Sequence, residues 1–99
     1  MLQPIRLWVD DVRPPQDKTM WWVRSVNEAI FLIKDRPVVF IDLDHDAGDF
    51  ACNGGDYIKL LDWLEEHNIN SITFHIHSMN PVGVMNMRRI IQKNHWKEI

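Results

Sequence analysis

The chain has 99 residues, a formal net charge of −3 at pH 7 and 45% hydrophobic residues, including five tryptophans. This length suits one small domain, and the apolar content excludes a disordered chain. No long block of lysine and arginine occurs, so we expect no binding to duplex DNA. Cys52 is the only cysteine, which excludes an internal disulfide and suits a reducing cytosol. No apolar run approaches the ~20 residues that span a membrane, so we expect no membrane association and a cytoplasmic protein.

The first part of the chain predicts two strands with a short irregular connection. Residues 5–9 are apolar with β-branched and aromatic members, and they stop at Asp10-Asp11, which indicates a buried strand that ends in two carboxylates. Residues 13–18 contain two prolines and break any regular element. Residues 20–24 then predict a second strand, with the character of an edge strand.

A helix and a central strand follow. Ser25 and Glu28 have the spacing of a capping box, which starts a helix, and Pro37 ends it because the residue before proline is pushed out of helical geometry. Residues 38–41 are apolar on both faces, which is typical of a central parallel strand. This strand runs directly into the polar residues 42–46.

The second half of the chain continues the alternation. Residues 47–55 form a polar, glycine-bearing loop, and a helical pattern begins at Asp56. Residues 71–77 alternate apolar and polar side chains, which predicts a strand. Asn80-Pro81 is a strong helix start, with asparagine as the N-cap and proline at the first helical position. The last five residues favour a short strand. Strands separated by helices imply right-handed crossovers and a parallel sheet.

Polar residues cluster at the ends of three predicted strands. In an open parallel sheet, ligands bind at the carboxyl ends of the strands, so the topology alone predicts one polar site there. The expected members are Asp10 and Asp11 after the first strand, Asp44, His45 and Asp46 after the third, and His77, Ser78 and Asn80 after the fourth.

The carboxylates of this site point to a cation. Asp10, Asp11 and Asp44 would repel one another at one end of a sheet, and a hard divalent cation such as Mg²⁺ relieves that repulsion. The alternative is that these aspartates cap loops in solvent. Asp42 lies one step earlier on its strand, where it can be buried and hydrogen-bonded, and we place it outside the site.

The histidines offer proton transfer. His45 lies between two aspartates and can serve as a general acid or base, or can orient the loop through a backbone carbonyl. His75 and His77 share one face of a strand because side chains alternate. That spacing can chelate zinc, but no clear third ligand is present. His77 is nearer the functional end, and His75 is expected to be a packed, hydrogen-bonded core histidine.

The remaining polar groups of the expected site are suited to bind a phosphate. Ser78, Asn80 and the amides at the start of the last helix form an anion cradle, although an N-cap role alone would explain Asn80. Arg13, just past the aspartate pair, adds a charge-assisted contact.

Four motifs together resemble the cyclic-phosphate processing receiver-like family, small relatives of the response-regulator receiver domain. The resemblance covers residues 5–92 and implies a flavodoxin-like, receiver-like α/β fold. We expect a three-layer parallel sheet of order 2-1-3-4-5, truncated by the loss of the usual first and last helices, in a single domain over residues 1–99. The motifs are Leu7-Trp-Val-Asp-Asp-Val-Arg-Pro-Pro15, Leu43-Asp-His-Asp46, Gly55-Asp-Tyr57 and His77-Ser-Met-Asn-Pro-Val-Gly83.

The resemblance also implies roles for individual residues. Asp10 and Asp11 match the acidic pair that binds Mg²⁺ in receivers, Asp44 matches the phospho-accepting aspartate, and Ser78 occupies the hydroxyl position. The receiver lysine has no convincing match, since Lys97 lies inside the last short segment. Conventional phosphorelay signalling is therefore not expected.

The function that this implies is a phosphoesterase or sensor for 2′,3′-cyclic phosphate ends or cyclic nucleotides. Its partner would be a small phosphate ligand or an RNA end carrying a cyclic phosphate. One alternative is a catalytically inactive receiver-like module that binds proteins, or that covers its bare sheet surface by forming a homodimer; another is a metal-dependent phosphatase for linear monoesters. In the main hypothesis His45 and His77 are the general acid and the general base, in an undecided order. The carboxylates of Asp10, Asp11 and Asp44 hold Mg²⁺ or orient a histidine. The phosphate is bound by Arg13, Ser78 and Asn80, and Asp46 supports the site.

Overall fold

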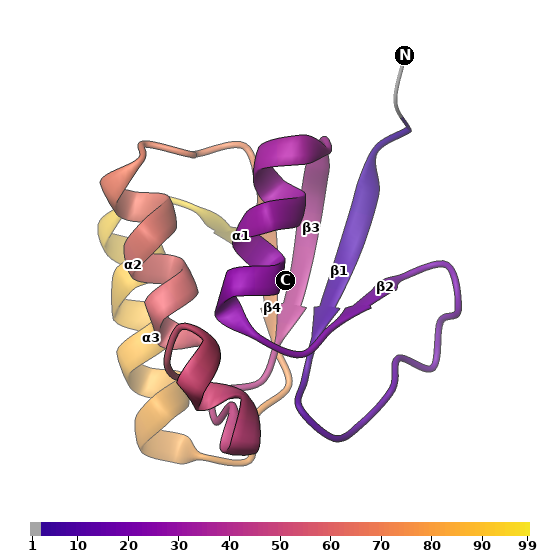
Figure 1. Cartoon of the computed structure of the whole chain (residues 1–99). Coiled ribbons are helices and arrows are strands. Elements are labelled where there is room, and N and C mark those ends of the chain that lie inside the picture. Colours follow the sequence, from indigo (N-terminus) through magenta and orange to yellow (C-terminus); the bar gives the residue numbers. More distant parts are fainter. Residues whose placement is uncertain (1–2) are drawn as a thin grey trace.

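Within residues 3–99, which the computed structural model describes, five parallel strands form one sheet in the order β2-β1-β3-β4-β5 (Figure 1). The predicted fold class and strand order are therefore confirmed. The strands are β1 (Ile5–Val9), β2 (Trp21–Val23), β3 (Val38–Leu43), β4 (Thr73–Ile76) and β5 (Lys97–Glu98). The helices are α1 (Val26–Asp35), α2 (Ile58–Glu66) and α3 (Pro81–Lys93), and a short 3₁₀ helix, η1 (Gly48–Asn53), precedes α2.

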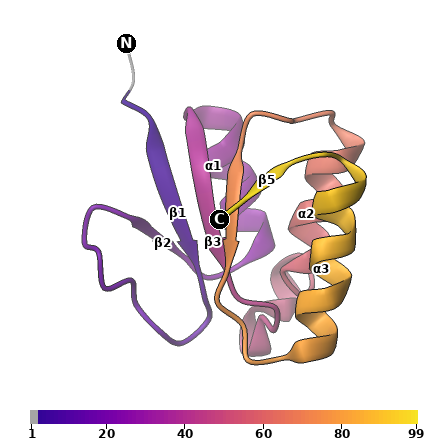
Figure 2. The same ribbon diagram turned by 180° about the vertical axis from the view of Figure 1, so that it is seen from behind.

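The three α-helices of this part of the chain lie on one face of the sheet (Figures 1 and 2). From β2 onward each helical connection moves across the sheet in the same direction, and right-handed crossovers in one direction place their helices on one side. The first and last receiver helices are missing from residues 3–99, as the sequence predicted. Consequently the described chain has two layers of secondary structure in place of the usual three.

The hydrophobic core fills the space between the sheet and these helices. Alternate residues of β1, β3 and β4 point into it, in agreement with the two-residue period of a strand. The helices contribute the apolar stripes expected of amphipathic segments. Fully buried core residues include Leu7, Val9, Ile41, Leu43 and Phe74 from the strands and Leu60, Leu61, Leu64, Met87 and Ile91 from the helices.

The opposite face of the sheet is covered in part by the segment between β1 and β2. On β1 this face carries Arg6 and Trp8, which alternate with the buried residues. The indole Nε1 of Trp8 donates to the carbonyl oxygen of Arg13 at 2.7 Å, and Arg6 donates to the carboxylate of Asp17 at 2.8 Å. These contacts hold the irregular, proline-containing segment against β1, on a face that a helix would otherwise occupy.

The connection between β3 and α2 is more ordered than the sequence predicted. Its expected loop contains η1, and Gly48 at the start of η1 has a φ of +55°. A Cβ atom at Gly48 would collide with the Asp11 carboxylate, so glycine is required there both for its backbone conformation and for close approach. Asp56 accepts a hydrogen bond from the Ala47 N–H at 2.9 Å, which fixes the end of this connection.

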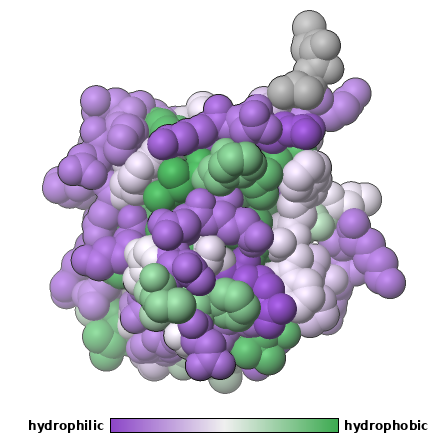
Figure 3. All heavy atoms as spheres, viewed as in Figure 1, coloured by the Kyte–Doolittle hydropathy of each residue, from purple (hydrophilic) through white to green (hydrophobic). Residues whose placement is uncertain are grey.

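The outer surface of the helical layer is mainly hydrophilic, with hydrophobic patches between the polar side chains (Figure 3). Phe31 of α1 is 67% exposed. Among the described residues, no helix has both the length and the apolar character needed to cross a membrane.

Replacement of the N-cap of α1 is expected to destabilise the fold. The Ser25 side chain accepts a hydrogen bond from the Glu28 N–H at 3.1 Å, and the Glu28 carboxylate accepts one from the Arg24 N–H at 2.9 Å. Ser25→Ala removes the first bond, so the free energy of unfolding should fall by about 1 kcal/mol in urea denaturation. Ser71→Ala, at an exposed loop position, is the control and should change it little. Equal losses in the two variants would contradict the cap.

Candidate functional site

The carboxyl ends of β1, β3 and β4 meet at a pocket of about 490 Å³. Because all three strands are parallel, the residues that follow them are brought to one edge of the sheet. Eight of the nine residues that the sequence assigned to the site line this pocket, and the ninth, His45, does not. The lining consists of Asp10, Asp11, Val12, Arg13, Asp44, Asp46, His77, Ser78, Met79 and Asn80.

Asp10 is the most firmly held carboxylate of the pocket. Its side chain is almost completely buried, and one oxygen accepts the N–H groups of Val12 and Arg13 at 2.9 and 2.8 Å. The other oxygen accepts from Nε2 of His77 at 2.9 Å. Burial raises the pKa of Asp10, but these hydrogen bonds and the charge of His77 outweigh it and leave the pKa below its usual value. Asp10 is therefore an ionised and oriented acceptor.

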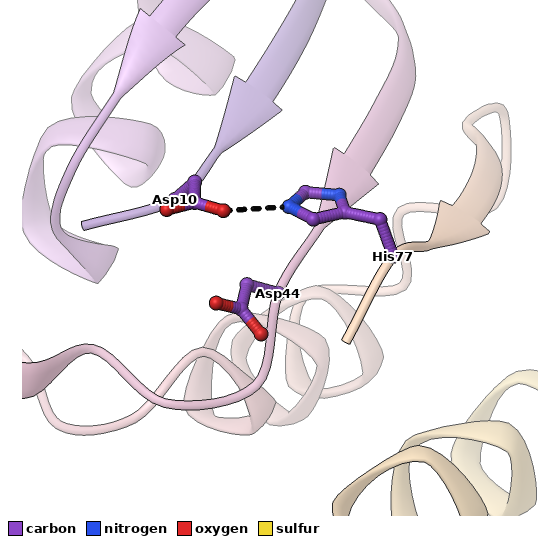
Figure 4. Close-up of side chains that lie close together, drawn as sticks. All are labelled: Asp10, Asp44 and His77. Carbon is purple, nitrogen blue, oxygen red and sulfur yellow. Dashed lines mark hydrogen bonds and ion pairs between the residues drawn. The ribbon is translucent and has the colours of Figure 1, made fainter. Parts of the chain in front are cut away.

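His77 lies between two carboxylates (Figure 4 shows the Asp10 side). Its Nδ1 donates to Asp42 at 2.7 Å while its Nε2 donates to Asp10, and its ring stacks on Trp8 with centroids 3.9 Å apart and planes 2° apart. Ionised carboxylates only accept hydrogen bonds, so both ring nitrogens must carry protons. Burial lowers the pKa of His77, but the bonds to Asp42 and Asp10 outweigh it and raise the pKa above its usual value. We therefore expect the imidazolium form of His77 to be favoured over that of an ordinary histidine.

Asp42, which the sequence analysis placed outside the site, is the second partner of His77. One of its oxygens accepts from both His77 and His75, the latter at 2.9 Å. The register of the sheet explains this arrangement, since Asp42 lies beside His75 on the neighbouring strand and His77 follows two residues later on the same face. Burial raises the pKa of Asp42, but the two histidines lower it further than burial raises it. The sequence contained one sign of this contact, since His75 and His77 were expected on one face of their strand.

Asp44 and Asp11 are the carboxylates with the least protein contact. Asp44 accepts the N–H of His45 through one oxygen at 2.7 Å, and its other oxygen has no hydrogen-bond partner among residues 3–99. The pKa of Asp11 is raised by burial and by the negative charges of Asp10 and Asp44. Asp11 therefore takes up a proton more readily than an ordinary aspartate.

Three side chains are close enough to share a metal ion. Asp10, Asp44 and His77 each offer a ligand atom, and these atoms all lie within 4.8 Å of one another (Figure 4). The two carboxylates fit the hard cation expected from the sequence. Asp11 lines the same pocket but is not in this group, whereas His77 is, and its nitrogen would have to lose a proton before it could bind a metal.

His45 packs away from the pocket. Its Nδ1 contacts the Asp46 carboxylate at 2.8 Å, and its ring lies against Gly83, where a Cβ atom would come within 2.5 Å of the ring. Gly83 is in the first turn of α3, so His45 connects the end of β3 to the start of that helix. This placement corresponds to the loop-orienting alternative for His45.

The groups expected to grip phosphate are partly occupied by the protein itself. The Asn80 side chain accepts from the Gly83 N–H at 3.0 Å and is the N-cap of α3, as predicted. The Ser78 hydroxyl accepts the Asn80 N–H at 3.1 Å. The main chain of Arg13 binds Asp10 and Trp8, while its exposed side chain remains available at the rim of the pocket.

Arg24 is a supporting residue that the sequence analysis did not identify. Its guanidinium donates twice to the carbonyl oxygen of Asp11, at 3.0 and 2.7 Å. The same group lies over the rings of Trp22 and Phe50, at 4.8 and 4.7 Å from their centroids. Arg24 therefore fixes the backbone of the aspartate pair from the neighbouring strand end. No motif marks it, because its partner is a main-chain oxygen distant in sequence.

The comparison with known proteins supports the receiver-like fold. Residues 5–93 match the family model of the cyclic-phosphate processing receiver domain. No curated protein and no solved structure matches the chain.

The protonation of His77 should be measurable directly. In the metal-free protein its ring should titrate above pH 6.5 by NMR, and Asp42→Asn should lower that pKa because one negative partner is lost. The stability that the raised pKa contributes is fully present below pH 6.5 and is lost as the pH rises through the folded pKa. Unfolding in urea should show this decline. Asp35→Asn, an exposed carboxylate on α1, is the control and should leave the His77 pKa unchanged. Titration of His77 below pH 6.5 would refute the imidazolium.

Proposed function

The chain belongs to the cyclic-phosphate processing receiver domain family, and from this premise we propose that it hydrolyses a cyclic phosphodiester in the pocket at the carboxyl ends of β1, β3 and β4. The observation that supports the proposal most directly is the Asp10–Asp44–His77 group, in which two carboxylates and an imidazole lie within 4.8 Å of one another. The description of the family suggests a cyclic phosphate as the ligand, and the acidic and histidine side chains of the pocket suggest hydrolysis.

The charge of the pocket favours a phosphodiester over a phosphomonoester. Its lining contains four aspartates against two cationic side chains, Arg13 and His77. A cyclic phosphodiester carries one negative charge, whereas a monoester carries about −1.5 to −2 at pH 7. The excess of carboxylates therefore repels a monoester more strongly. Because the pocket has more carboxylates than cationic side chains, a bound divalent cation would reduce the repulsion of any phosphate ligand.

A metal ion fits this pocket. Asp10 and Asp44 would hold it, and it would supply positive charge to the phosphoryl oxygens during the reaction. The protein keeps Asp10 in place for this purpose through the two backbone N–H groups and His77. His77 thus acts as a positioning residue, because neither of its nitrogens has a free lone pair.

Asp11 is the proposed general base. Its raised pKa brings it closer to neutrality, where a carboxylate exchanges protons more effectively. In the reaction, a water oxygen forms a bond to phosphorus and one of the two ester P–O bonds of the ring breaks. Asp11 accepts the proton of the water and returns it to the leaving ester oxygen, so that the product is a phosphomonoester with a free hydroxyl. Arg13 at the rim is placed to bind the phosphate oxygens.

Turnover of nucleoside 2′,3′-cyclic monophosphates tests the proposal. We expect hydrolysis to a monophosphate that increases with Mg²⁺ or Mn²⁺ and stops with EDTA. Asp11→Asn should reduce kcat by about 10²-fold or more with a smaller effect on KM. Asp62→Asn, an exposed carboxylate on α2 outside the pocket, is the matched control and should have wild-type activity.

Absence of both turnover and binding with 2′,3′-cyclic mononucleotides, 3′,5′-cyclic mononucleotides and cyclic dinucleotides would refute the proposal and favour the inactive module. Full activity of Asp11→Asn would refute the assignment of the base alone.

Discrimination by charge is a second test. In EDTA, a nucleoside 3′-monophosphate should bind progressively more weakly from pH 5 to pH 7.5, because its second ionisation has a pKa of about 6. A 2′,3′-cyclic monophosphate keeps one charge over this range and should lose less affinity. Calorimetric titration of both ligands at each pH provides the comparison. Tighter binding of the monophosphate than of the cyclic compound at pH 7.5 would instead favour a phosphatase for linear monoesters.

A further inference from the structure

A second hollow, which we call the α3 groove, adjoins the pocket. It has a volume of about 730 Å³ and runs along one side of α3, the helix seen at the front in Figure 2. Ser78 and Met79 line both the pocket and the groove, so the two hollows adjoin at these residues. A ligand held in the pocket would enter the groove by passing over Ser78 and Met79.

The chemistry of the α3 groove differs from that of the pocket. The pocket is lined by four carboxylates, whereas the groove lining has none and contains Arg88 and Arg89. Arg88 donates to Glu98 at 2.7 Å, which neutralises part of its charge. Arg89 contacts only uncharged atoms, the Asn86 side-chain oxygen and the Met85 sulfur. Arg89 is thus a cation with no carboxylate partner among residues 3–99.

Apolar side chains lie between the pocket and these arginines. Met79 is 86% exposed and Met85 is 52% exposed, and Val84 completes the wall of the groove. Methionine side chains are flexible and polarisable, so they adapt to flat apolar ligands such as nucleobases. The order along the groove is therefore acidic pocket, apolar wall, basic end.

We propose that the α3 groove binds the RNA strand that leads to a terminal 2′,3′-cyclic phosphate, with Arg89 on a phosphate upstream of the reacting one. This inference rests on the proposed function and names its substrate as an RNA end instead of a free cyclic mononucleotide. A 2′,3′-cyclic phosphate requires a 2′-hydroxyl, so the strand must be RNA. Nucleobases would pack on Met79 and Met85, and the strand phosphates would meet the arginines.

The spacing along α3 agrees with this arrangement. Arg89 follows Pro81 by eight residues, which is about 12 Å along a helix axis. Arg89 is therefore too far from the start of α3 to contact a phosphate held at the pocket. A mononucleotide would leave the basic end of the groove unused, whereas a strand of a few nucleotides would reach it.

Fluorescence anisotropy with labelled RNA tetramers tests the inference. One tetramer ends in a 2′,3′-cyclic phosphate and is titrated into the full chain carrying Asp11→Asn, which slows turnover; the other ends in a 3′-hydroxyl. Arg89→Ala should weaken both tetramers by about three- to tenfold and reduce the salt dependence by about 0.7 in log–log slope. Arg89→Ala should leave unchanged the constant with which a mononucleoside 2′,3′-cyclic phosphate competes with the labelled tetramer for binding. Arg89→Lys should restore most of the affinity.

Arg36→Ala is the matched control, because Arg36, a partly buried arginine at the C-cap of α1, lines neither hollow. Unchanged binding of both tetramers in Arg89→Ala would overturn the inference, as would an equal loss for tetramers and mononucleotide. The proposed function fails in a different way: both tetramers would bind equally well, the loss in Arg89→Ala would persist, and the cyclic mononucleotide would not bind. Binding of neither RNA by the wild-type chain would also overturn the inference.

Discussion

The ion pairs of His77 with Asp10 and Asp42 tie together the ends of three strands. Asp10 follows β1, Asp42 lies on β3 and His77 follows β4, so one protonated ring joins the three central strands at their carboxyl edge. Without the proton, two partly buried carboxylates would face each other across a neutral ring, and loss of one member of a buried charged pair is strongly destabilising. Trp8 stacks on the ring and fixes its plane. The geometry of the pocket depends on this cation.

Contact with His77 also distinguishes the two adjacent aspartates, Asp10 and Asp11. Asp10 is held in a fixed, ionised state by His77 and by backbone N–H groups, which suits a ligand for a positive charge. Asp11 has no histidine partner, and burial together with the charges of Asp10 and Asp44 moves its pKa upward, which suits proton transfer. The pKa values of two adjacent residues of the same type thus move in opposite directions because of their surroundings. A metal ion bound by Asp10 and Asp44 would compete with the His77 proton for the same small space, so metal binding would depend on pH in this pocket.

The sequence predicted the fold and the location of the site because both follow from local patterns. Strands that end in aspartates, and the Asn80-Pro81 helix start, need only neighbouring residues to be recognised. The partners of His77 could not be found in this way. Strand alternation gives the face on which a side chain lies, but the choice of Asp42 over a solvent contact depends on the register of β3 against β4. The position of His45 could not be predicted from local patterns either, since it is set by contact with Gly83 on α3, which is distant in sequence.

The position of His77 is related to the face of the sheet that carries no helix within residues 3–99. Helices normally cover both faces of an open parallel sheet of this type. Here one face carries only the irregular segment after β1, so Trp8, Asp42 and His75 remain accessible from that side. His77 is on this same face and packs on Trp8, in space that a helix packed there would fill. Within residues 3–99 no helix covers this face, and the ring of His77 occupies part of it, stacked on Trp8 and bonded to Asp42 and Asp10.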